Sequence, residues 1–145
     1  MDWYARAFIK ASLTWFSLGV ALGLAMAAHP AWVIYRPAHA HMNVLGFVTM
    51  MIYGIAYHVI PRFTGSRVHS PRLATVQWWV ANVGLALLVV GFLARPHSAA
   101  IGVHLLIVGG TVSAAAAYMF VYNIWRTIGT ERPRASAAAA RPRGP

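Results

Sequence analysis

The stretch AHAHMNVLGFVTMMIYGIAYHVI, residues 38–60, joins a long apolar run to two histidines at its start, His39 and His41. It contains no Asp, Glu, Lys or Arg. Its length exceeds the roughly 20 residues that an α-helix needs to cross the hydrocarbon core of a bilayer. The stretch therefore predicts a transmembrane helix that carries imidazoles near one of its ends.

Three further apolar runs flank this one. Charged residues make up only 10% of the 145-residue chain, and the mean hydropathy is +0.59, whereas a soluble domain carries roughly 25% charged residues. We therefore predict an all-α integral membrane protein, with a four-transmembrane-helix bundle over residues 1–128. The expected helices cover residues 8–28, 38–60, 73–94 and 99–126. Their connections are short, as is typical of antiparallel neighbours in one bundle.

The positive charges are divided unequally between the two sides of this topology. Ten of the twelve Lys and Arg residues fall on one side, and only Arg36 and Arg95 fall on the other. This asymmetry places both termini in the cytoplasm, in a bacterial-type inner membrane. The net charge of +10 thus indicates orientation in the membrane rather than nucleic-acid binding. The Arg/Ala/Pro-rich residues 129–145 are expected to form a disordered basic tail near anionic headgroups.

Five of the seven histidines lie toward the non-cytoplasmic face. Of these, His39, His41 and His104 lie within apolar runs, where a polar side chain is costly and usually faces a partner, a cavity or a metal. The chain has no cysteine and only two acidic residues, so the expected metal ligands are imidazoles alone. All-imidazole ligation suits haem iron, with copper as the other metal to consider.

Helix geometry separates His39 from His41. Residues two apart differ by about 200° around a helix axis and do not face each other. The two side chains are therefore expected to serve two different sites, one on each flank of the helix. The His39 flank would continue with Asn43, Gly46 and Met50, and the His41 flank with Leu45, Val48 and Ile52. Asn43 and Gly46 are thus predicted to border a cofactor.

Two other groups of residues have competing interpretations. His58, at the cytoplasmic end of the same helix, either hydrogen-bonds at the interface or binds a cofactor propionate. Met42, Met50 and Met51 are soft ligands that copper(I) prefers, but methionines on an apolar helix more often fill gaps in the core. The small residues Gly19 and Gly23 in the first helix permit the close approach of a neighbouring helix.

Residues 38–65, AHAHMNVLGFVTMMIYGIAYHVIPRFTG, resemble the tenth transmembrane helix of the catalytic subunit of haem-copper oxidases. The shared order is an A-H-x-H start, a glycine at Gly54, a histidine at His58, and then P-x-F-x-G. The entry Arg36-Pro-Ala-His39 also resembles the R-P-x-H start of another helix in some members. The similarity extends without a gap over this segment.

The resemblance implies a role for each histidine of the pair. His39 would bind the iron of one haem, and His41 would bind the iron of a second haem on the opposite flank. The oxidase holds its copper with histidines of another helix, within a segment of the H-P-E-V-Y type that this chain lacks. We therefore expect a haem b protein for electron transfer rather than a complete oxygen-reducing enzyme.

The second ligand for each iron has two candidate sources. His104 would complete a site within one chain, whereas another copy of the chain would complete it across an interface. The family's twelve helices form a pseudo-threefold arrangement, so a homotrimer of this four-helix chain is the favoured oligomer. Expected partners are the bilayer and a periplasmic electron carrier, quinol or a respiratory oxidase. Alternative functions are a haem- or copper-handling assembly factor for a terminal oxidase or nitric oxide reductase, and an accessory subunit without a cofactor.

Overall fold

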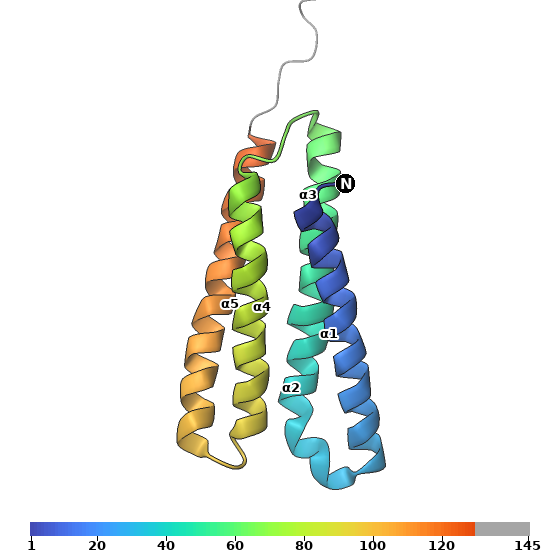
Figure 1. Ribbon diagram of the computed structural model, residues 1–145, viewed down its shortest axis with the longest axis vertical. Coiled ribbons are helices and arrows are strands. Elements are labelled where there is room, and N and C mark those ends of the chain that lie inside the picture. The colour runs from blue at the N-terminus through green and yellow to red at the C-terminus, as the bar shows by residue number, and fades with distance from the viewer. Residues whose placement is uncertain (130–145) are drawn as a thin grey trace, which may run out of the picture.

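The computed structural model describes residues 1–129, and these residues form long antiparallel helices (Figure 1). The elements in chain order are α1 (Trp3–Ala28), the 3₁₀-helix η1 (Pro30–Tyr35), α2 (Arg36–His41), the π-helix η2 (Met42–Thr49), α3 (Met50–Thr64), α4 (Pro71–Ala94) and α5 (Ala99–Ile128). Four segments are long and apolar enough to cross a membrane, because η1 through α3 form one of them. The predicted all-α fold with four long apolar helices is confirmed, and the chain is an integral membrane protein. Apart from Gly129, the predicted basic tail lies outside the described residues.

The four long segments are arranged as two pairs (Figure 1). α1 runs beside the continuous rod of α2, η2 and α3, and α4 runs beside α5. The α4–α5 pair is the closer one, because glycines remove side chains from the contact. A Cβ added at Gly109 would lie 2.6 Å from the backbone nitrogen of Leu88, and one added at Gly84 would lie 2.7 Å from that of Ser113. Small residues allow membrane helices to approach to this distance.

A buried polar network joins three helices at the end of the bundle where α3 meets α4. The Tyr57 hydroxyl donates to Gln77 Oε1 at 2.6 Å and accepts from Asn123 Nδ2 at 3.2 Å. Asn123 also pairs with the backbone N–H and C=O of Ser70, both at 2.9 Å. All three side chains are fully buried. Water cannot replace a lost partner there, so breaking one of these hydrogen bonds would cost the desolvation free energy of the group left unpaired. The network fastens the connection between α3 and α4 to α5.

The rod ends at a residue whose backbone adopts the left-handed conformation. Gly65 has φ 64° and follows α3, a conformation in which glycine carries no Cβ penalty. Five residues later, Ser70 caps α4 by accepting a hydrogen bond from the Leu73 backbone N–H at 3.2 Å. Together these two ends reverse the chain within a short connection.

The π-helix within the rod is the element that the sequence pattern did not predict. Its hydrogen bonds span five residues rather than four, and the Thr49 hydroxyl follows the same spacing, donating to the Val44 carbonyl at 2.8 Å. A π-turn contains more residues per turn than an α-turn. Side chains beyond His41 therefore rotate away from the positions that a regular 100° step assigns to them.

Candidate functional site

His39 lies between α2 and α1. Its Nδ1 donates to the backbone carbonyl of Gly19 at 2.8 Å, which fixes the proton on Nδ1 and leaves Nε2 as the acceptor atom. Asn43, one turn further along the rod, donates to the His39 carbonyl at 2.9 Å. Its amide nitrogen also lies 3.4 Å from His39 Nε2. Asn43 is thus the nearest polar neighbour of the free nitrogen, on the flank that the sequence analysis assigned to it.

The two glycines of α1 form the slot in which this imidazole lies. A Cβ added at Gly23 would lie 2.8 Å from His39 Cε1, and one added at Gly19 would lie 2.9 Å from Asn43 Nδ2. Contacts below 3.0 Å are not tolerated by real side chains, so neither position accepts even a methyl group in this arrangement. A flat cofactor on the His39 flank would require α1 to separate from α2.

His41 lies on the opposite side of the rod, against α4. Its Nδ1 donates to the Pro37 carbonyl at 2.8 Å, so its Nε2 is also left as the acceptor. The imidazole packs on the Phe92 ring with 4.7 Å between centroids and 40° between planes. One histidine of the pair thus contacts α1 and the other contacts α4, as the two-residue spacing predicts.

A cavity borders the His41 flank. It has a volume of about 270 Å³ and is lined by Ile34, Pro37, Phe92, Arg95 and Pro96. Two of these residues, Pro37 and Phe92, contact His41 directly. Its walls are apolar apart from Arg95, and no side-chain hydrogen bond or ion pair engages Arg95 among residues 1–129. This flank therefore offers an apolar cavity wall that includes one cation, and two residues of that wall contact His41.

The positions beyond the pair only partly follow the expected flanks. Gly46 lies inside the bundle, where an added Cβ would be 2.5 Å from Trp15 Cβ and 3.0 Å from Leu85 Cδ2. It is a contact point of three helices rather than part of an open cofactor slot. Val48 and Ile52, expected beside His41, are about half exposed on the outer surface of the bundle. The π-helix explains this difference, since it changes the rotation per residue after Met42.

His104 lies near the start of α5 and faces outward. Its Nδ1 donates to the Ala100 carbonyl at 2.7 Å, so this imidazole also presents Nε2, and the side chain is exposed. α5 packs on α4 and α3. Within residues 1–129, no group of three or more His, Asp or Glu residues is placed to hold one metal ion. The structure therefore does not gather His39, His41 and His104 into a single metal site.

His58 has a different environment. Arg62 Nη1 lies 2.6 Å from His58 Nδ1 and 2.6 Å from the His58 carbonyl oxygen. Because a guanidinium only donates, His58 Nδ1 is an acceptor here, unlike the corresponding atom of the other three histidines. The observed contacts correspond to the hydrogen-bonding interpretation of His58 at the helix end.

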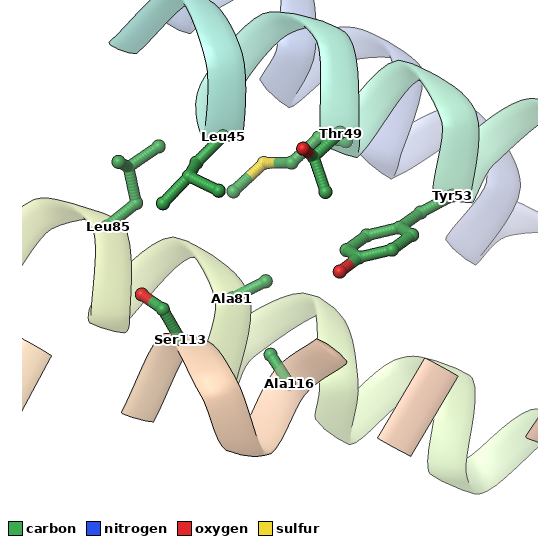
Figure 2. Close-up of a pocket in the computed structure, with 8 residues that line it drawn as sticks. Leu45, Thr49, Tyr53, Ala81, Leu85, Ser113 and Ala116 are labelled. Atoms are coloured by element: carbon green, nitrogen blue, oxygen red, sulfur yellow. The ribbon is translucent and has the colours of Figure 1, made fainter. Parts of the chain in front are cut away.

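A second, smaller cavity lies between the rod and the α4–α5 pair (Figure 2). Figure 2 shows Leu45, Thr49 and Tyr53 pointing from the rod toward Ser113 and Ala116 of α5. Its volume of about 30 Å³ admits a water molecule but no cofactor. The Ser113 hydroxyl is buried and has no hydrogen-bond partner among the described residues, which makes it a natural contact for such a water.

Sequence reasoning missed three parts of the histidine environment. The sequence shows Gly19 and Gly23 as a packing stripe, but nothing in it says that an imidazole fills the slot. Phe92 and Arg95 come from a different helix, and no local pattern connects them to His41. The only signal for Arg95 is the charge asymmetry, because it is one of just two cations on its side of the topology predicted from the sequence.

Fold and site together define a polytopic helical membrane protein with one span that presents imidazoles on two opposite faces. Residues 4–140 match the family described as cytochrome C and quinol oxidase polypeptide I, and the chain belongs to this family. It is 26% identical over 141 residues to the Cbb3-type cytochrome c oxidase subunit CcoN1 of Stutzerimonas stutzeri, with 80% of this chain and 29% of that protein covered. It is 24% identical over 136 residues to cytochrome c oxidase subunit 1 of Rhodobacter capsulatus, with 77% and 25% covered. The chain thus spans between a quarter and a third of the length of these relatives.

Proposed function

We propose that this chain is a membrane b-type cytochrome that resembles a fragment of the oxidase subunit and transfers electrons through haem with two histidine ligands. The observation that carries the proposal is the shared geometry of His39 and His41. Each imidazole donates Nδ1 to a backbone carbonyl and keeps Nε2 as an acceptor, on opposite faces of one span; Nε2 of His39 has the Asn43 amide nitrogen 3.4 Å away. Histidines that bind metals usually donate their other ring nitrogen in this way.

The fit to haem differs between the two flanks. On the His41 flank, the 270 Å³ cavity and the Phe92 ring supply an apolar surface that can receive an edge of a porphyrin. On the His39 flank, Gly23 lies against the imidazole and leaves no such space. We therefore assign the first haem to His41, and we expect haem at His39 only if α1 moves away from α2.

When bound, haem with two axial histidines supplies a one-electron couple without an open position for a substrate. The residues of the chain bind and tune it. His41 would hold the iron through Nε2, while the Pro37 carbonyl keeps its ring oriented. Phe92 keeps water from that side of the imidazole. Two cations at this end of the rod, Arg36 and Arg95, would be available to pair with the haem propionates.

The second ligand is expected to come from another copy of the chain, in a homo-oligomer for which we favour a trimer. His104 is exposed with its Nε2 free, and α5 packs on α4 and α3. Closed rings are the usual outcome when one asymmetric interface repeats. Three copies of this chain together approach the length of one of the oxidase subunits that it matches. In such a ring, His104 of one copy would reach the His41 flank of the next.

The site is proposed to lie toward the non-cytoplasmic side of a bacterial-type inner membrane, with both termini in the cytoplasm. The charge asymmetry of the sequence supports this orientation. A haem at this depth would exchange electrons with a periplasmic carrier or with quinol, or with a respiratory oxidase in the same membrane. The proposal includes no copper site and no oxygen reduction by this chain.

A copper-handling role finds less support in the positions of the methionines. Met42 and Met50 are 7% and 2% exposed and belong to the apolar core. The Met51 sulfur accepts a hydrogen bond from the Ser12 hydroxyl at 3.8 Å. These contacts fit the gap-filling role of methionine, and they favour electron transfer over the handling of copper(I).

The test is an absorption spectrum of the purified protein, oxidised and reduced, with haem and copper measured per chain. We expect the absorption spectrum of a low-spin haem, which changes reversibly when the protein is reduced and reoxidised. The His41→Ala variant should keep its helical circular dichroism but lose this spectrum. His69→Ala is the matched control, because His69 is an exposed histidine at the opposite end of the bundle. A colourless protein, or an unchanged spectrum in the His41 variant, would refute the assignment.

A further inference from the structure

The first two turns of α1 carry a cationic depression on the outside of the bundle. It is lined by Trp3, Arg6, Ala7 and Lys10, which follow one another at spacings that place them on one helix face. Its volume is about 340 Å³, within the range of small-ligand pockets. It lies at the opposite end of α1 from the slot that holds His39.

The two cations of this depression have no ion-pair partner among residues 1–129. Neither the Arg6 nor the Lys10 side chain makes a hydrogen bond or an ion pair with any of residues 1–129. The sequence contains only two acidic residues, Asp2 and Glu131, and the Asp2 carboxylate accepts from the Tyr4 hydroxyl at 3.1 Å. Asp2 also makes no side-chain cap to α1. An anion placed here would therefore meet two unpaired cations and the positive end of the helix dipole.

An aromatic wall lies beside the cations. Trp3 is 48% exposed, and its ring packs edge-on against Trp78 of α4 with 6.2 Å between centroids. The indole Nε1 of Trp78 is buried and has no acceptor among the described residues. Tryptophan at the end of a membrane span is typical of the level of lipid headgroups. The depression thus combines cations for a phosphate with aromatic surface for the ester and glycerol region.

We propose that this depression binds the phosphodiester headgroup of an anionic phospholipid. Arg6 and Lys10, one turn apart, neutralise the phosphate, while Trp3 and Ala7 contact the apolar part of the same lipid. The charge asymmetry assigns this end of α1 to the cytoplasmic leaflet, where anionic lipids attract basic segments. The inference does not depend on haem, and it uses no residue of the histidine site.

The experiment compares phosphatidylglycerol with phosphatidylcholine on the full chain in detergent, with lipid adducts counted by native mass spectrometry. We expect phosphatidylglycerol to be retained selectively by the wild-type chain. The double variant Arg6→Gln/Lys10→Gln should bind it about 25-fold more weakly, because each cation near the surface contributes roughly a fivefold factor. The variant Arg6→Lys/Lys10→Arg should retain the lipid.

The matched control is Arg67→Gln/Arg72→Gln, which removes the same charge from two exposed arginines outside the depression. Retention of the lipid in this control, with loss in the Arg6/Lys10 variant, supports the proposal. Equal loss in both variants would show only general charge attraction and would overturn it. Complete displacement of the lipid by inorganic phosphate would assign the depression to a free anion and would also overturn it, as would equal retention of the two lipids.

Discussion

The Nδ1 atom of His39 lies 2.8 Å from the carbonyl oxygen of Gly19, and its Cε1 atom lies where a side chain at Gly23 would begin. Two glycines of α1 therefore shape the place of one imidazole in the next membrane span. This relationship gives the small-residue stripe of α1 a specific purpose. Helix packing alone would accept alanine at such positions, whereas an imidazole between the helices does not.

Replacing Gly23 by alanine tests this relationship. The added methyl group would lie 2.8 Å from His39 Cε1, so the imidazole or α1 must shift. We expect a loss of about 1–3 kcal/mol in the free energy of unfolding. The measurement is denaturant or thermal unfolding in detergent. A variant as stable as the wild type would show that the slot is wider than described.

The buried hydroxyl of Tyr57 supports a second prediction. Tyr57→Phe leaves Gln77 Oε1 without its donor, while Asn123 Nδ2 keeps the Ser70 carbonyl as its acceptor. An unpaired buried polar group costs about 1–3 kcal/mol, so this variant should unfold at a lower denaturant concentration. Adding Gln77→Leu removes the oxygen that Tyr57→Phe leaves without a donor. The double variant should therefore be less destabilised than the sum of the single variants, and simple additivity would contradict the network.

The number and nature of the spans follow from the sequence because they depend on local composition alone. A run such as residues 38–60 has no charged residue, and its length matches the bilayer, so no long-range contact is needed to recognise it. The opposite orientations of His39 and His41 follow in the same way from the helix period. The four spans are confirmed by the long apolar helices of residues 1–129. The contacts of His39 with α1 and of His41 with α4 agree with the predicted opposite orientations.

The surroundings of the two histidines could not be predicted for a physical reason. The π-helix at Met42–Thr49 has no signature among its own residues, which are those of an ordinary apolar helix. It moved Val48 and Ile52 to the outer surface, where the regular period had placed them beside His41. Similarly, Phe92 reaches His41 only through the tertiary arrangement of α4.

Two adjacent glycines of α5 provide a prediction with its control one residue away. A Cβ at Gly109 would lie 2.6 Å from the Leu88 backbone nitrogen, whereas a Cβ at Gly110 meets nothing closer than Leu88 Cδ2 at 3.9 Å. Gly109→Ala should push α5 from α4 and destabilise the protein by several kcal/mol. Gly110→Ala should be neutral or stabilising by about 0.5–1 kcal/mol, because alanine favours the helix. Thermal unfolding of the two variants side by side gives the answer, and equal melting temperatures would contradict the described contact.

Complementation between two defective copies tests whether His41 and His104 meet across an interface. Neither His41→Ala nor His104→Ala should bind haem alone, since each lacks one ligand of every site. Co-expressed with different tags, the two variants would assemble into mixed rings. An interface is then complete where a copy that retains His41 adjoins a copy that retains His104, which occurs at about one of the three interfaces of each mixed trimer. We therefore expect mixed trimers, isolated through both tags, to recover roughly a third of the wild-type haem. If both ligands came from one chain, mixing would restore nothing. Full haem binding by His104→Ala alone would instead assign the second ligand to another residue.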